Sequence, residues 1–309
     1  YKSTSNATWN SKRNVFYDNP LPIGISGFAM ETSDSLAEVD LVIKDQPGLG
    51  YSFSKLALFH EKGLNNYDIT VCDEVNCEQG ILKSTDSTSN PFVSELKLNR
   101  PMKELILRNK RSDTAKHSTR IYGLLLENDS AGVLYNMIGV NGAEYKHYNM
   151  SKYFAPQLAY MNADLIILSL GTNEAFSAGF DRLSFNNNID TLIMNIKLSN
   201  PNAAILLTTP GDSYRKSRKG RVKNPDMKIA RVTIINYCQQ HNLAYWDWYE
   251  IMGGYGSMAN WFLMKLAQKD RVHYNGRGYQ IQGDLLYRAL MKGYNHYVQE
   301  KKDSVGTSR

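Results

Sequence analysis

A change in the spacing of apolar residues near position 120 most constrains the fold of this chain. Before that position, apolar and polar residues alternate in short runs, as they do in strands that bury only one face. The clearest runs are AEVDLVIKD (37–45), KLALFHEK (55–62), YDITVCDE (67–74), SELKLN (94–99) and KELILRN (103–109). Stretches rich in Gly, Pro, Asn and Ser separate them and are typical of turns. Short strands at this spacing predict an antiparallel β-sandwich.

Beyond residue 122 the apolar runs become more continuous and are followed by amphipathic stretches. The expected strands are 132–140, 163–171, 203–209 and 243–248, and the expected helices are 151–161, 185–200, 225–242 and 279–298. Strands that are apolar on both faces and alternate with helices predict a parallel sheet covered by helices. We therefore expect an α/β fold with two domains, a β-sandwich at 1–122 and an α/β domain at 123–309.

Composition excludes several classes of protein. The chain has 309 residues, of which 42% are hydrophobic and 21% charged, as in ordinary globular proteins. No apolar run reaches the length of a transmembrane helix. The net charge is +6, and basic residues gather between 215 and 223, in a predicted loop that is either simply solvated or placed near an acidic substrate. No nucleic-acid-binding signature accompanies them, and we expect no nucleic-acid partner.

The three cysteines have no spacing typical of a metal or redox site. Cys72 and Cys77 flank four residues, so a β-hairpin could join them as a disulfide in an oxidising compartment. Cys238 falls within a helical pattern and is expected in the core.

Three predicted loops carry residues suited to acyl transfer. GVNGAEY contains Gly142, GTNEAF contains Asn173, and DRVHYNGRGY contains Asp270 and His273. Ligands of parallel α/β sheets meet the carboxyl ends of the strands, where these loops are expected. A glycine N–H and an asparagine amide can donate to an oxyanion, and a carboxylate can hold an imidazole in one tautomer.

Each motif also has a purely structural interpretation. A glycine pair after a strand is commonly a tight turn, and GTNE can cap a helix. A single histidine is usually structural. The occurrence of all three motifs in this order, after successive elements, favours the catalytic interpretation.

Residues 132–299 resemble the SGNH (GDSL-type) hydrolases, which carry Ser, Gly, Asn and His in four separate blocks. Gly142 matches the glycine block, Asn173 the G-x-N block, and Asp270 with His273 the terminal D-x-x-H block. The first 120 residues are similar, more weakly, to a carbohydrate-binding-like sandwich that some members insert between their first and second blocks, including some peptidoglycan O-acetylesterases. The resemblance implies a flavodoxin-like parallel sheet.

The stretch TTPGDSYRK (208–216) contains a Gly-Asp-Ser triplet, the signature of the nucleophile in this family. In the family that block precedes the other three, whereas Ser213 follows Gly142 and Asn173. The resemblance therefore implies that the nucleophilic serine and the first, central strand lie upstream of Tyr1. Ser213 is the alternative nucleophile within this chain, but Pro-Gly-Asp-Ser is also strong turn chemistry, and we expect a loop residue.

The resemblance implies a serine esterase that needs no cofactor or metal and removes O-acyl groups, chiefly O-acetyl, from a carbohydrate or peptidoglycan. Export from the cytoplasm would suit that substrate. A non-catalytic glycan-binding protein on the same scaffold and a lipase- or thioesterase-like member are the alternatives. Trp246, Trp248, Tyr249 and Tyr255 could stack on sugar rings, although a core role for the two tryptophans is equally consistent with the sequence.

Overall fold

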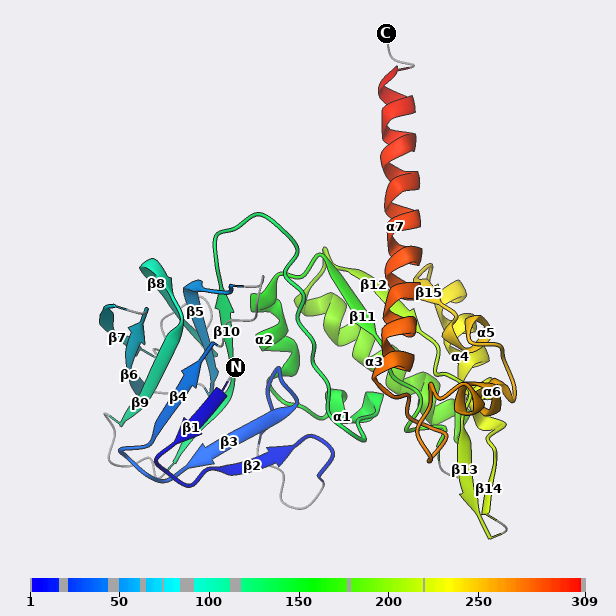
Figure 1. The fold of residues 1–309 in the computed structure, drawn as a ribbon, viewed down its shortest axis with the longest axis horizontal. Coiled ribbons are helices and arrows are strands. Elements are labelled where there is room, and N and C mark those ends of the chain that lie inside the picture. The colour runs from blue at the N-terminus through cyan, green and yellow to red at the C-terminus, as the bar shows by residue number, and fades with distance from the viewer. Residues whose placement is uncertain are drawn as a thin grey trace. The chain divides into compact units, whose positions relative to one another are not determined.

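The computed structural model describes residues 2–16, 22–43, 50–61, 65–73, 75–83, 92–111, 118–176, 179–218 and 220–306. The chain forms two compact units. The first comprises Tyr1–Asp164 with Asn188–Ala203, and the second comprises Leu165–Asn187 with Ala204–Arg309. Each is described by itself, with the element labels of Figure 1. The domain boundary at 122/123 stays a prediction.

Ten antiparallel strands build the first unit. They are β1 (Lys2–Ser5), β2 (Asn10–Arg13), β3 (Phe28–Thr32), β4 (Glu38–Val42), β5 (Phe53–His60), β6 (Asn65–Cys72), β7 (Cys77–Lys83), β8 (Val93–Met102), β9 (Glu104–Arg111) and β10 (Thr119–Glu127). One five-stranded sheet has the order β1-β4-β9-β6-β7, and the other has the order β2-β3-β10-β5-β8. The predicted antiparallel sandwich is confirmed.

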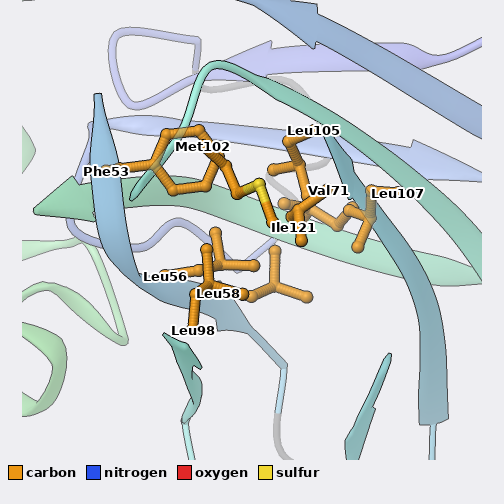
Figure 2. Close-up of a cluster of buried hydrophobic side chains, with 9 residues drawn as sticks. All are labelled: Phe53, Leu56, Leu58, Val71, Leu98, Met102, Leu105, Leu107 and Ile121. Carbon is orange, nitrogen blue, oxygen red and sulfur yellow. The ribbon is translucent and has the colours of Figure 1, made fainter. Parts of the chain in front are cut away.

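The core of the sandwich draws side chains from both sheets. Figure 2 shows this cluster, in which β5, β8 and β10 of one sheet meet β6 and β9 of the other. Its members are Phe53, Leu56, Leu58, Val71, Leu98, Met102, Leu105, Leu107 and Ile121. Burying one such side chain contributes about 1.5–3 kcal/mol, so the alternating pattern of the sequence holds the two sheets together.

A disulfide joins Cys72 to Cys77 across the β6–β7 hairpin. The two cysteines are register partners at the end of the ladder nearest the turn, where the strands bring them directly opposite each other. Cys238 is buried in a helix of the second unit, as expected, and burial raises the pKa of its thiol to about 11.

Two short helices complete the first unit, α1 (Tyr145–Asn149) and α2 (Phe154–Met161). The buried Gln157 of α2 fastens this helix to the sandwich, because its Oε1 accepts from the Ile25 N–H at 2.8 Å and its Nε2 donates to the His60 carbonyl at 3.3 Å. Tyr160 packs edge-on against Phe59 of β5.

A parallel sheet forms the centre of the second unit. Its strands are β11 (Leu165–Leu168), β12 (Ala204–Thr208) and β15 (Ala244–Trp246), in that order. The helices are α3 (Arg182–Ser199), which spans the division between the units, α4 (Asp226–Gln240), α5 (Trp248–Ile251), α6 (Ser257–Leu263) and α7 (Gly276–Gly306), a single continuous helix in Figure 1. Parallel strands alternating with helices confirm the predicted α/β class.

The expected strand at 132–140 is wrong. Residues 133–140 form no regular element, and Val133, Tyr135 and Met137 are highly exposed, Val133 to 95%. An apolar run becomes a strand only where a neighbour supplies backbone hydrogen bonds, and no described strand pairs with this segment. The composition of the run indicated burial, but the pairing partner that burial requires is absent among the described residues.

The predicted basic loop at 215–223 is instead a hairpin in the described residues. Strand β13 (Tyr214–Ser217) pairs antiparallel with β14 (Gly220–Lys223) in a sheet of two strands. No helix in the described ranges has both the length and the apolar run needed to cross a bilayer.

Candidate active site

A short turn before α7 brings Asp270 and His273 together. The Nδ1 atom of His273 lies 2.7 Å from Oδ2 of Asp270. The other carboxylate oxygen accepts from the backbone N–H groups of Val272 and His273, at 2.9 and 3.0 Å. Arg271 adopts a left-handed conformation (φ 55°), and a bridge between Ala267 and Tyr274 closes the base of the turn. A spacing of three residues therefore suffices to place the acid against the imidazole.

The electrostatics of this pair suit an acid that orients a base. Partial burial opposes ionisation of Asp270, but the hydrogen bonds from the His273 ring and from the Val272 and His273 N–H groups outweigh it and lower the pKa of Asp270. An ionised Asp270 can only accept, so Nδ1 of His273 carries the proton and Nε2 is the basic nitrogen. The His273 side chain is 53% exposed, which leaves the ring accessible to a reactant.

The turn after β11 places Asn173 at the surface. Gly171 has φ 109°, a conformation that a side chain would strain, and its N–H donates to Oε2 of Glu174 at 3.0 Å. The buried Asn224 donates to the Ala175 carbonyl at 2.7 Å and anchors the end of the turn. The exposed Asn173 is thus presented from a braced loop at the carboxyl end of a parallel strand, as expected.

Gly142 also lies in a turn, with φ 87° and open space where a side chain would project. The turn is closed by a hydrogen bond from the Ala143 N–H to the Val140 carbonyl at 3.0 Å. Gly142 belongs to the first unit, whereas Asn173, Asp270 and His273 belong to the second, where the structure brings Asp270 and His273 into direct contact.

Ser213 is buried, with 1% of its surface exposed. Its Oγ makes no hydrogen bond within the described structure. The Ser213 carbonyl accepts from Asn224 N–H at 2.9 Å, and the next residue, Tyr214, starts β13. The serine of the Gly-Asp-Ser triplet is therefore packed inside the fold.

The other two residues of the triplet are also structural. A side chain at Gly211 would place Cβ within van der Waals overlap of the Tyr274 hydroxyl and the Trp248 indole nitrogen. The Asp212 Oδ2 accepts from the N–H groups of Gly256 and Met258 at 3.1 and 3.0 Å, at the start of α6. This buried carboxylate is a feature that sequence reasoning missed, because its partners lie more than forty residues further along the chain.

The aromatic stretch around position 248 forms core. Trp246 stacks on Trp248 with ring centroids 5.2 Å apart, and Trp248 donates through Nε1 to the Tyr274 hydroxyl at 2.9 Å. Both tryptophans and Tyr249 are buried, which leaves no face for a sugar ring. Tyr255 remains exposed.

Sequence reasoning also missed a contact between the hairpin and the turn that carries Asp270 and His273. Arg221 of β14 donates to the Asp270 carbonyl oxygen at 2.6 Å, and the Tyr214 N–H of β13 donates to the Arg271 carbonyl at 2.9 Å. The only signal in the sequence was the clustering of positive charge. Among the described residues, no group of three potential metal-ligating side chains gathers.

Comparisons with known proteins agree with the fold. The structure of a peptidoglycan O-acetylesterase superposes with a TM-score of 0.72 at 23% identity, over 94% of this chain and 77% of that one. An acetyl xylan esterase (TM-score 0.39, 19% identity, 49% and 78% of the chains) and a putative acylhydrolase from Bacteroides fragilis (0.39, 16%, 49% and 72%) also match. No curated protein matches the sequence.

The sequence model of the GDSL-like lipase/acylhydrolase family matches residues 110–281, more than half of the chain. That range contains Gly142, Asn173, Asp270 and His273. The parallel sheet that follows a β-sandwich is the arrangement that the resemblance predicted, and it recurs in the superposed esterase. Sequence match and fold together show that this chain belongs to the GDSL-like lipase/acylhydrolase family.

Proposed function

We propose that this protein is a serine esterase that removes O-acyl groups, chiefly O-acetyl, from a carbohydrate or from peptidoglycan. The observation that carries the proposal is the 2.7 Å hydrogen bond between Asp270 and a half-exposed His273, in a member of a family of acylhydrolases. The choice of substrate is supported by the shared fold with a protein described as a peptidoglycan O-acetylesterase.

In the proposed reaction, a serine hydroxyl attacks the ester carbonyl while Nε2 of His273 takes its proton. The imidazolium then protonates the leaving sugar oxygen, which departs as a free hydroxyl, and an acyl-serine remains. Water deprotonated by the same nitrogen attacks the acyl-serine, and the imidazolium returns the proton to the serine oxygen as the free acid leaves. Asp270 holds the Nδ1 proton throughout and stabilises the imidazolium. The Asn173 amide donates to the oxyanion.

We propose that the attacking serine is not Ser213, because a buried hydroxyl cannot reach an external ester. Within the described structure, β11 pairs only with β12, and its other edge offers unpaired backbone groups. A strand from a segment outside residues 1–309 is proposed to pair with this edge. Because parallel strands end at the same side of a sheet, a serine at its carboxyl end would lie alongside the turn that carries Asn173.

An extracytoplasmic location is proposed with this function. The Cys72–Cys77 disulfide supports it, since disulfides persist in oxidising compartments and are rare in the cytosol.

The test is acetate release from O-acetylated peptidoglycan and from p-nitrophenyl acetate by a longer chain that includes the proposed strand. His273→Ala should lower kcat/KM by about 10⁴-fold, because the general base is lost. The matched variant Ser213→Ala should stay within about threefold of the parent enzyme. Equal collapse of both variants would instead identify Ser213 as the nucleophile. Full activity of His273→Ala would refute the mechanism.

A further inference from the structure

The β13–β14 hairpin carries four exposed cations that form no salt bridge with a carboxylate of the described residues. They are Lys216, Arg218, Arg221 and Lys223. The described ion pairs include only one basic residue of the hairpin, Arg215, whose guanidinium lies 2.6 Å from Asp226. The positive charge of the hairpin is therefore available to an external anion.

The register of the hairpin gathers three of these cations on one face. Lys216 lies directly opposite Arg221. Lys223, two residues after Arg221 on β14, lies opposite Tyr214. Side chains two residues apart share a face, so Lys216, Arg221 and Lys223 lie on the same side of the ribbon. Like charges directly opposite each other destabilise a ladder, and in a two-stranded ribbon no further strand offsets that cost. A bound anion would remove the repulsion.

This cationic face adjoins the turn that carries Asp270 and His273. Arg221 itself donates to the Asp270 carbonyl at 2.6 Å, and the first residue of the hairpin, Tyr214, is bonded to Arg271. On the other side, the Lys223 ammonium lies 5.2 Å from the centre of the Tyr255 ring, which is 54% exposed. A polymer held on this face would meet positive charge and the exposed Tyr255 ring, and Arg221 joins the face to the turn that carries His273.

We propose that this face binds the carboxylates of an acidic glycan, and so selects anionic acetylated polysaccharides as the substrate class. The inference rests on the proposed esterase function. An acidic glycan fits all three neighbouring features, because its carboxylates suit the cations, its rings suit Tyr255, and its esters suit the Asp270–His273 pair. Nucleic acid would suit only the cations and the ring.

The experiment measures binding of residues 1–309 to polygalacturonate, with neutral dextran and a single-stranded oligonucleotide as comparison ligands. The double variant Lys216→Gln/Lys223→Gln should bind polygalacturonate roughly three- to tenfold more weakly at low salt. Its affinity should also depend less steeply on salt, because fewer counterions are exchanged. The control Lys228→Gln/Lys292→Gln removes the same charge from exposed positions on α4 and α7 and should bind like the parent.

Equal weakening of both double variants would overturn the proposal in favour of a net-charge effect. Failure to bind polygalacturonate, or binding it no better than dextran, would also overturn it. Tighter, hairpin-dependent binding of the oligonucleotide would replace the glycan by nucleic acid. Binding requires no turnover, so an absence of esterase activity leaves this test intact.

Discussion

At the scale of single residues, Asp212 gives the Gly-Asp-Ser triplet a structural role in this chain. Its carboxylate is buried and accepts hydrogen bonds from two backbone N–H groups at the start of α6. Such groups are unsatisfied at the beginning of every helix, so an acceptor there stabilises the element. Through Asp212 the triplet, which directly precedes β13, is hydrogen-bonded to the start of α6, and its serine is buried.

The burial of Asp212 predicts an unusual dependence of stability on pH. Burial raises its pKa above the ordinary value of 3.8, against the opposing effect of the Met258 and Gly256 N–H groups and of Lys223. As pH rises through that ordinary value, the unfolded chain releases the proton while the folded chain retains it. The stability contributed by the protonated group is therefore full below pH 3.8 and is lost as pH rises through the folded pKa.

Asp212→Asn isolates this effect. At low pH the variant should match the parent within about 1 kcal/mol, because the protonated Oδ1 of the parent and the amide N–H₂ of the variant are both neutral donors, and Oδ1 has no hydrogen-bond partner in the described structure. As pH rises above 3.8 the variant should become the more stable of the two, since only the parent loses stability. Urea unfolding at a series of pH values measures both effects. A variant that instead becomes less stable than the parent as pH rises would mean that Asp212 is held ionised.

Residue-level prediction succeeded where the chemistry is local. Asp270 and His273 are three positions apart, and one turn joins them whatever the rest of the fold does. Asp212 could not be assigned in the same way, because its partners Gly256 and Met258 are set by tertiary packing. The residue types around Ser213 predicted a turn, but they did not indicate that the Ser213 side chain would be buried.

At the scale of elements, the periodicity of apolar residues correctly predicted those strands and helices that pair or pack with a neighbouring element. The alternating runs that became β5 and β9 pack both sheets against one core. The pattern at 185–200 became α3, which starts three residues earlier and ends one residue earlier than predicted. The run at 132–140 has similar apolar content but no pairing neighbour among the described strands. Composition predicts which residues can be buried, whereas pairing depends on the remainder of the sheet.

The β6–β7 hairpin gives an element-scale prediction. The disulfide closes a very short loop. By restricting the conformational entropy of the unfolded chain, a loop of this length is expected to stabilise the fold by about 2 kcal/mol. Cys72→Ser/Cys77→Ser should lower the free energy of unfolding by that amount, measured by denaturant titration. Reductant should affect the parent equally and the variant not at all. If reductant still destabilises the double variant, the loss does not come from this bond.

At the scale of the whole molecule, the chain combines a β-sandwich with a parallel sheet whose β11 edge is unpaired in the described structure. Two five-stranded sheets share a core in the first unit, while β11, β12 and β15 form the parallel sheet of the second. The resemblance to the SGNH hydrolases predicted the fold class, a parallel sheet that follows a β-sandwich.

The proposed origin of the nucleophile predicts how the whole chain reacts with a fluorophosphonate, which labels activated serines. Residues 1–309 alone should remain unlabelled, because Ser213 is buried and its hydroxyl has no hydrogen bond to a base. A longer chain with the proposed strand should be labelled in that strand, as peptide mass analysis would locate. Labelling mapped to Ser213 would contradict the proposal.

The unpaired edge of β11 gives the protein a practical property. A peptide carrying the proposed strand, supplied separately, would find its hydrogen-bonding template already present on residues 1–309. The two fragments would then behave as a split enzyme, silent apart and active on reconstitution.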